Sequence, residues 1–451
     1  MRILQVVHSL PFLNLAGTEI YAYDLSRELS RRHKVYIFSR SCDTRAKEYE
    51  VTESNKEGME IFLLNNTFKY ADNFQMYYDN PDIDQSFAKI CERIRPDIVH
   101  IHHLIFLSTG IIKILNERSI PVVFHLHDYW SLCPKWHILA NDLYPCEKVF
   151  SGNFDQECPG CLGGVLNINK EAKSIYRTCQ RFLPDPLVRA MKRAYFSCTL
   201  SASNPDRSIT MLKERRLRIA DYLKGVNYFI APSEFLKNKF VQSGTPAEKI
   251  KVIHNGIDKR PFINRAKKRS AKVRFAFIGT LLPAKGLHIL IQAFNGIDTS
   301  KAELTIYGRI YSYTGFEDYL PYLKKIAKNK SIRFAGEFTH GMSAKTFSEI
   351  DVLVVPSIWY ENYPLVIQEA LLSGTPVIAS RIGGIPEMIK DGVNGTLFTP
   401  GDIDELSKKM ALLLENEEIR NRLKEDAPQV TDLQEHAAAL EELYGKTVKR
   451  K

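Results

Sequence analysis

The chain alternates between short apolar runs rich in Val, Ile and Leu and longer stretches whose apolar residues recur at helical spacing. The short runs predict buried strands and the longer stretches predict amphipathic helices. In the first half we predict strands at residues 3–8, 35–39, 61–64, 98–102, 122–126, 228–231 and 251–254. Helices are predicted between them at residues 18–31, 83–94, 105–117 and 233–243. This alternation predicts a parallel sheet with helices on both faces.

A polar, basic run over residues 258–270 without periodicity is typical of an interdomain linker. The alternation then restarts, with strands predicted at residues 274–279, 303–308, 331–335, 352–356 and 377–380 and helices at 286–294, 316–327, 343–350, 364–373 and 385–390. Further helices are predicted near residues 402–415, 419–424 and 433–444. We therefore predict an α/β protein of two doubly wound, Rossmann-like domains facing a central cleft. The predicted units are residues 1–260, residues 271–425, and a C-terminal helix in 426–451 that packs back on the first domain.

Residues 129–220 interrupt the first domain and are far longer than an ordinary connection, which favours a functional insertion. Its Cys133, Cys146, Cys158 and Cys161 include one Cys-x2-Cys pair, which can supply two thiolates to a structural Zn²⁺. Four unlinked thiols, or disulfides in an oxidising compartment, are the alternatives.

With 451 residues, 44% of them hydrophobic and 25% charged, the composition is that of a globular protein. We find no signal-peptide pattern and no apolar window of spanning length, so we expect a cytoplasmic protein. The net charge is +10, and residues 170–224 hold 13 Lys and Arg against 5 Asp and Glu. Such a stretch can contact nucleic acid or the anionic inner face of a membrane, but no nucleic-acid-binding motif accompanies it.

Three segments carry candidate chemistry at predicted strand ends. Gly17 precedes a predicted helix, where free N–H groups attract anions, and Lys285 adds a cation at a second strand-to-helix crossing. Glu361 follows the apolar strand 352–356, and Glu369 lies in the next helix, up to ~12 Å away at 1.5 Å per residue. That separation does not suit a pair of glycosidase carboxylates and instead suits two ends of one extended ligand. The alternatives are an ordinary turn at Gly17, a solvated surface lysine at Lys285, and two surface glutamates at Glu361 and Glu369.

Together, Gly17-Thr18-Glu19, His254-Asn255-Gly256, the Gly279 to Gly286 segment, the Glu361-x7-Glu369 stretch and Gly383-Gly384 resemble the retaining GT-B glycosyltransferases of family 4. The resemblance is strong over residues 251–415 and weaker before them.

The resemblance implies that Glu361 binds donor sugar hydroxyls, Glu369 the nucleotide ribose, and Lys285 and Gly17 the diphosphate. It places His127 near the donor sugar and residues 336–340 near the base, and it adds Asn362, Tyr363, Thr280 and Arg309 to the donor site. Many members have Arg where Thr280 stands and Gly where Ala16 stands, so neutralisation of the diphosphate depends more on Lys285, Arg309 or Arg381.

His100, His102, His103 and His125 lie at the ends of two neighbouring predicted strands, and a metal cluster must be considered. We favour core or cleft histidines, and the resemblance implies catalysis without a metal or other cofactor.

The expected activity is transfer of a sugar from a UDP-, GDP- or ADP-sugar to an acceptor hydroxyl with retention of configuration, in assembly of a cell-surface polysaccharide or glycolipid. The expected acceptor is lipid-linked or a saccharide, met at the inner face of the membrane. A nucleotide-sugar epimerase of the same fold and a nucleic-acid-binding protein remain as alternatives.

Overall fold

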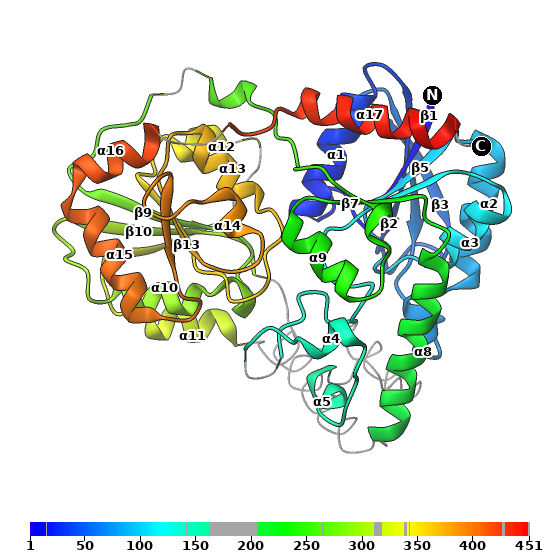
Figure 1. Ribbon diagram of the computed structural model, residues 1–451, viewed down its shortest axis with the longest axis horizontal. Helices are drawn as coiled ribbons and strands as arrows, with labels where there is room; N and C mark the ends of the chain where they lie inside the picture. The colour runs from blue at the N-terminus through cyan, green and yellow to red at the C-terminus, as the bar shows by residue number, and fades with distance from the viewer. Residues whose placement is uncertain are drawn as a thin grey trace.

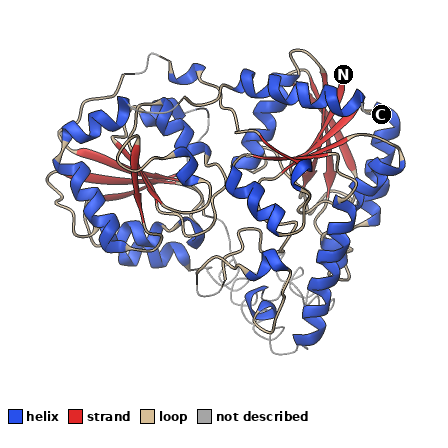
Figure 2. Cartoon of the chain, in the orientation of Figure 1, coloured by secondary structure: helices blue, strands red, loops and turns tan. Residues whose placement is uncertain are grey.

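The structure is a computed structural model, and it describes all residues except 15, 141–142, 163–204, 264–265, 311–317, 338–340, 342, 426–428 and 450–451. Two α/β units lie side by side, each with a sheet between layers of helices (Figure 2). This is the predicted fold class. None of the helices in the described residues is long and apolar enough to cross a membrane.

The N-terminal sheet has eight strands in the order β3-β4-β2-β1-β5-β6-β7-β8, and all neighbours except β3 and β4 are parallel. The order reverses at β1 and β5, whose carboxyl ends are the position where open α/β sheets bind ligands. The strands are β1 (Arg2–Val6), β2 (Lys34–Ser41), β3 (Val51–Lys56), β4 (Met59–Asn65), β5 (Ile98–Ile101), β6 (Val122–His125), β7 (Tyr228–Ala231) and β8 (Ile250–Val252).

The C-terminal sheet has six parallel strands in the order β11-β10-β9-β12-β13-β14, so its switch point lies between β9 and β12. The strands are β9 (Val273–Ile278), β10 (Ala302–Tyr307), β11 (Ile332–Gly336), β12 (Val352–Val355), β13 (Val377–Ser380) and β14 (Gly395–Phe398).

Helices cover both faces of both sheets (Figure 2) and bury apolar side chains in the cores. On the N-terminal unit they are α1 (Gly17–Leu29), α2 (Pro81–Ile94), α3 (Gly110–Glu117), α4 (Lys148–Ser151), α5 (Cys158–Leu162), α8 (Pro205–Leu223), α9 (Glu234–Gln242) and α17 (Leu433–Lys449). On the C-terminal unit they are α10 (Leu287–Phe294), α11 (Tyr319–Ile326), α12 (Ser343–Phe347), α13 (Leu365–Leu372), α14 (Ile385–Met388), α15 (Ile403–Glu415) and α16 (Glu417–Glu425). Short 3-10 helices are η1 (Gln75–Tyr77), η3 (Ala247–Lys249), η4 (Arg260–Phe262) and η5 (Pro283–Lys285).

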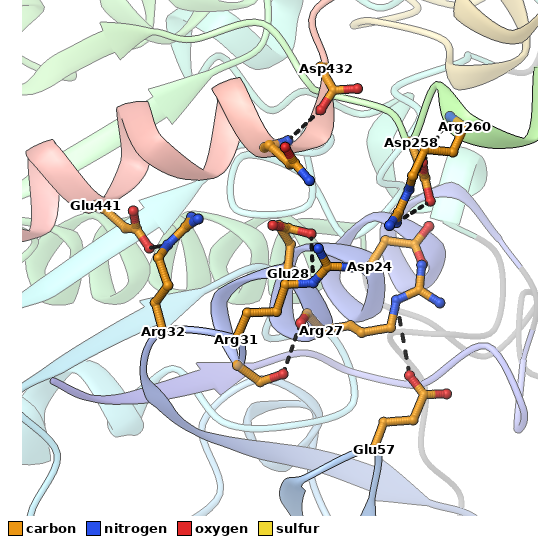
Figure 3. Close-up of polar contacts among 12 residues, drawn as sticks. Asp24, Arg27, Glu28, Arg31, Arg32, Glu57, Asp258, Arg260, Asp432 and Glu441 are labelled. Carbon is orange, nitrogen blue, oxygen red and sulfur yellow. Dashed lines mark hydrogen bonds and ion pairs between the residues drawn. The ribbon is translucent and has the colours of Figure 1, made fainter. Parts of the chain in front are cut away.

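The chain crosses between the two units twice, and the two crossings lie next to each other. Ile257 donates its N–H to Thr431 O at 3.1 Å, and Leu433 donates its N–H back to Ile257 O at 3.1 Å. After the second crossing, α17 runs over the N-terminal unit beside α1 (Figure 1). Figure 3 shows Arg32, in the turn that follows α1, bonded to Glu441 of α17; the nitrogen and oxygen atoms are 2.9 Å apart.

The insertion between β6 and β7 contains α4, α5 and α8. Figure 1 shows α4 and α5 below both units, with α8 rising along the N-terminal unit. α5 packs against α8, and α4 packs against α9. The described part of the insertion therefore continues the N-terminal unit rather than forming a separate body.

Candidate active site

Lys285 and Glu361 follow the two strands that flank the switch point of the C-terminal sheet. β9 leads through Gly279 into η5, which ends at Lys285, and its neighbour β12 leads into the loop that holds Glu361. Because parallel strands end at the same edge of the sheet, the two side chains meet there. Lys285 Nζ lies 2.6 Å from Glu361 Oε1.

The Glu361 carboxylate is buried and held by more than the lysine. Its side chain is 5% exposed, against 27% for Lys285. Ser357 donates its hydroxyl to the same oxygen at 2.6 Å, and Lys285 Nζ lies 5.0 Å from the centre of the Trp359 ring. The buried indole N–H of Trp359 has no hydrogen-bond partner among the described residues. The Glu361 loop therefore supplies a carboxylate and an unused indole donor, and Lys285 of the neighbouring η5 adds a cation beside them.

Two glycines allow the loops at this edge to approach so closely. Gly286 has φ of +66°, and a Cβ there would lie 1.7 Å from Pro356 O. Gly383 has φ of +62°, and a Cβ there would lie 2.2 Å from Glu361 O. Both positions thus need glycine for conformation and for space.

Asn362 joins the C-terminal unit to the N-terminal unit. Its amide donates to His127 O at 2.5 Å and accepts from the Tyr129 hydroxyl at 3.1 Å. The next residue, Tyr363, stacks on His254 with ring centres 5.0 Å apart. Residues after β6 and β8 are therefore fixed against the Glu361 loop.

The remaining expected donor residues lie around these loops. Glu369 lies in α13, is 4% exposed, and accepts a hydrogen bond from the Ser343 hydroxyl. Thr280 O accepts from Leu282 N at 2.9 Å, and Arg309 lies 3.5 Å from Glu337. Of residues 336–340, expected near the base, 338–340 lie outside the described residues.

Gly17 is the exposed first residue of α1, and open space lies where a Cβ would stand. The loop before it is tied down by Glu19, which is 1% exposed and bonded to Asn14 at 2.7 Å and His8 at 3.2 Å. Burial alone would raise the Glu19 pKa, but His8 and these hydrogen bonds outweigh it and lower the pKa. The arrangement leaves the N–H end of α1 open to an anion.

His127 is half-buried and lies beside a cluster of buried histidines at the ends of β5 and β6. It lies 3.3 Å from His102 and stacks on His125 at 4.4 Å between ring centres. Burial, with His125 and other neighbouring histidines, lowers the pKa of His127 well below its usual range. A neutral imidazole is therefore expected at this position.

His100, His102 and His125 have ligand atoms within 4.8 Å of one another, which is the spacing of a metal site. Their nitrogens, however, are largely engaged by the protein. His102 bonds Gln5 at 2.7 Å and His127, and His125 bonds Tyr21 at 3.2 Å and Asn255 at 3.1 Å. This pattern favours a hydrogen-bonded core.

The start of the insertion packs on the Glu361 loop, which the sequence reasoning did not foresee. The rings of Trp136 and Trp359 are 6.0 Å apart, and the Tyr360 hydroxyl donates to Glu147. Burial, with smaller effects of Lys135 and Lys285, lowers the pKa of His137 to about 3. The aromatic residues around 129–137 were the available signal, but nothing in the sequence pairs them with residues some 220 positions later.

Much of the basic stretch, 170–204, lies outside the described residues. In α8, Arg215 is fully buried, donates to Trp130 O at 2.6 Å and lies over the Trp130 ring. Arg207, Lys213 and Leu217 of the same helix are exposed, Leu217 by 71%. Only part of this helix's charge is thus available to a partner.

Solved structures of similar fold cover the whole chain. Sucrose-phosphate synthase from Thermosynechococcus elongatus has a TM-score of 0.68, with 16% identity over 100% of both chains. Anabaena HepE, solved in complex with UDP and glucose, has a TM-score of 0.62, with 18% identity over 99% of both chains. The two doubly wound units are the GT-B fold of these glycosyltransferases.

The sequence matches the family "Glycosyl transferases group 1" over residues 258–430 and "Glycosyltransferase Family 4" over residues 15–154 and 196–260. An uncharacterised glycosyltransferase of Methanocaldococcus jannaschii is 32% identical over 355 residues, which are 73% of this chain and 76% of that protein. The chain therefore belongs to glycosyltransferase family 4, as its motifs indicated, and is a glycosyltransferase.

Proposed function

We propose that the protein transfers a sugar from a nucleotide-sugar donor to an acceptor hydroxyl with retention of configuration. The observation that carries this proposal is the Lys285–Glu361 pair at the switch point of the C-terminal sheet. The UDP complex of the similarly folded HepE supports a nucleotide as one half of the donor.

In the proposed mechanism, Lys285 leaves Glu361 for the donor diphosphate and stabilises the charge that develops on the leaving phosphate. Glu361, held by Ser357, accepts hydroxyls of the donor sugar. The N–H end of α1 at Gly17 approaches the diphosphate from the other unit, and His127 approaches the donor sugar. Because the Glu361 carboxylate is buried and keeps its bond from Ser357, it suits hydroxyl recognition better than nucleophilic attack. The phosphate leaves and the acceptor hydroxyl enters on the same face, which gives retention. The departing phosphate oxygen takes the proton of the acceptor hydroxyl as the new glycosidic bond forms.

Catalysis on this proposal needs no added divalent metal, because Lys285 supplies the cation. Glu369 is proposed to bind the ribose, with Thr280, Arg309, Asn362 and Tyr363 completing the donor site. The donor is a UDP-, GDP- or ADP-sugar, and a thermal-shift panel of the three distinguishes them, since a ligand of the native state raises its apparent stability.

The site is tested with Lys285→Ala and Glu361→Gln. Each removes a charge-assisted contact to donor, worth about 1.5–3 kcal/mol, so we expect at least a tenfold loss of transfer rate. The matched control is Lys268→Ala with Glu349→Gln, an exposed ion pair at the opposite end of β12. Turnover is measured with and without acceptor and with EDTA, and the product anomer is assigned by NMR.

Control variants that lose as much activity as the site variants contradict the site assignment. Donor conversion at full rate without acceptor indicates an epimerase, and an inverted product contradicts retention.

We also propose that the acceptor is borne by a membrane, in assembly of a cell-surface polysaccharide or glycolipid. The support is the exposed cations of α8, Arg207 and Lys213, with Leu217 between cationic neighbours. Anionic lipid attracts each such cation by about 1 kcal/mol.

We expect binding to anionic vesicles in a flotation assay, weakened by salt and by Arg207→Glu with Lys213→Glu. Lys324→Glu with Lys325→Glu, exposed on α11, is the charge-matched control. Equal recovery with neutral and anionic vesicles contradicts membrane binding, and salt-sensitive retention of duplex DNA or RNA instead supports nucleic-acid binding.

A further inference from the structure

Four free cysteines lie in the first part of the insertion, and segments bearing them converge on one of them, Cys161. Cys161 Sγ lies 3.3 Å from Lys135 Nζ, two residues after Cys133. The same sulfur lies 3.9 Å from Leu139 O. The two ends of the segment from Cys133 to Cys161 are thus in contact at the Cys161 thiol.

Residues 138–140 pair with residues 144–146 and bring a further cysteine to this place. Leu139 pairs with Pro145, Ala140 donates its N–H to Tyr144 O at 2.8 Å, and Cys146 donates its N–H to Ile138 O at 2.7 Å. Cys146 therefore lies at the end of this pairing, beside Leu139, the residue whose carbonyl contacts Cys161. 

Cys158 and Cys161 are three positions apart on α5, so their side chains share one face of the helix. All four thiols are half-buried. The contacts of Cys161 with Lys135 and Leu139, and the backbone bond of Cys146 to Ile138, bring the segments that carry the four thiols together.

We propose that Cys133, Cys146, Cys158 and Cys161 bind one structural Zn²⁺. Four thiolates, two of them from a Cys-x2-Cys turn, form the closed tetrahedral set typical of structural zinc. Among the described residues, the atoms at metal-ligand spacing are those of His100, His102 and His125, and the four thiols lie farther apart than this. Zinc binding would therefore draw the four sulfur atoms closer together. His102 and His125 are hydrogen-bonded through both ring nitrogens, and the four thiols lie half-buried beside short elements that zinc would hold together.

The proposed metal has a structural purpose that the contacts of the insertion explain. α4 has 4 residues and α5 has 5, too few to be stable as isolated helices. This segment nevertheless carries Trp136 against Trp359 and Glu147 against Tyr360. Zinc would fix the segment against the loop of Glu361, a consequence that rests on the proposed function.

Zinc content is measured by elemental analysis on the whole chain, purified without chelators and without nucleotide. We expect about one Zn²⁺ per chain in the wild type and loss of it in the Cys158→Ser, Cys161→Ser double variant. Cys42→Ser, at an exposed cysteine in the first domain, is the control and retains zinc. Wild-type protein without zinc, or a double variant that retains it, overturns the proposal.

Should the double variant not fold, cobalt substitution of the wild type decides. Thiolate ligation gives intense sulfur-to-cobalt charge-transfer absorption, and its absence overturns the proposal. A zinc-free chain lighter by two hydrogens per cysteine pair in non-reducing mass spectrometry shows a disulfide and likewise overturns it. These readouts need no sugar nucleotide, so they are independent of the proposed transferase activity.

Discussion

Lys285 occupies its position because the next residue is Gly286. The backbone there turns through φ of +66°, and Pro356 O lies where a side chain would begin. Pro356 immediately follows β12, so this close approach sets the distance between the Lys285 loop and the Glu361 loop.

Gly286→Ala is expected to lower the free energy of unfolding by roughly 1–3 kcal/mol, since it combines a disfavoured φ with a clash against backbone. It should also lower transfer activity by displacing Lys285. Urea denaturation checks the first effect. Gly296→Ala is the control, because nothing lies within 4 Å of a Cβ there and its φ is not positive. Equal stability of the two variants would contradict the role of Gly286.

At the scale of residues, the sequence located candidates but not their partners. Lys285 and Glu361 could be singled out because each follows an apolar strand of a doubly wound domain. The bonds of Asn362 to His127 and Tyr129 span more than 230 positions, and local pattern carries no record of such pairs. His127 was expected near the site, but its stacking on His125 depends on strand register and was not foreseen.

The helix α17 is attached to the N-terminal unit by buried polar bonds as well as by apolar contacts. Tyr444 of this helix bonds His100 at 2.6 Å, and His436 bonds Tyr21 of α1 at 2.5 Å. Both pairs are buried among the apolar residues Ala437, Leu440 and Leu443. The helix is thus joined to the first sheet by polar bonds within an apolar contact.

Tyr444→Phe is expected to cost about 1–3 kcal/mol of unfolding free energy, because it leaves a buried His100 nitrogen without its partner. Tyr322→Phe, at a tyrosine of α11 that is 43% exposed, should change stability by less than about 0.5 kcal/mol. Thermal unfolding of both variants is the measurement, with faster proteolysis near α17 in Tyr444→Phe. A Tyr444→Phe protein as stable as the wild type would show that the helix is held by apolar packing alone.

The elements that the sequence did not predict have plain physical reasons. β3 has the sequence Val-Thr-Glu-Ser-Asn-Lys, with five exposed residues, because it is an antiparallel edge strand. β14 is only 4 residues long and begins with Gly395. The helix predicted at 105–117 begins at Gly110, since the preceding residues form a turn with Phe106 at φ of +65°. Alternation identifies buried strands well and edge strands poorly.

On the scale of the whole molecule, burial lowers the pKa of several histidines. The pKa of His436 falls to about 4, that of His288 to about 4 and that of His137 to about 3. Burial also lowers the pKa values of His100, His102, His125 and His127 well below their usual range, and the neighbouring histidines lower them further. Asp84 acts in the opposite sense, since burial raises its pKa to about 7.

Stability should therefore fall as the pH falls from about 6.5 towards 4, because the unfolded chain binds protons on these histidines before the folded chain does. Above pH 6.5 the histidines are neutral in both states and contribute no pH dependence. At about 1.4 kcal/mol per pKa unit, His436 alone lowers the free energy of unfolding at pH 5 by about 2 kcal/mol. The raised pKa of Asp84 offsets part of the total loss. Urea denaturation at pH 7.5 and pH 5 measures the difference. Equal free energies at the two pH values would mean that the histidines are charged in the folded protein.

The return of the chain to its first domain has a consequence for synthesis on the ribosome. The apolar side of α1, with Tyr21, Ala22 and Leu25, is completed by side chains from Ala437 to Tyr444. The ribosome therefore synthesises the whole second unit before it makes the helix that covers the first. During that interval the unfinished first sheet presents an uncovered apolar face, of the kind that chaperones bind and that favours aggregation. The helix α17, which is made after the second unit, is thus the one that lets the first domain close.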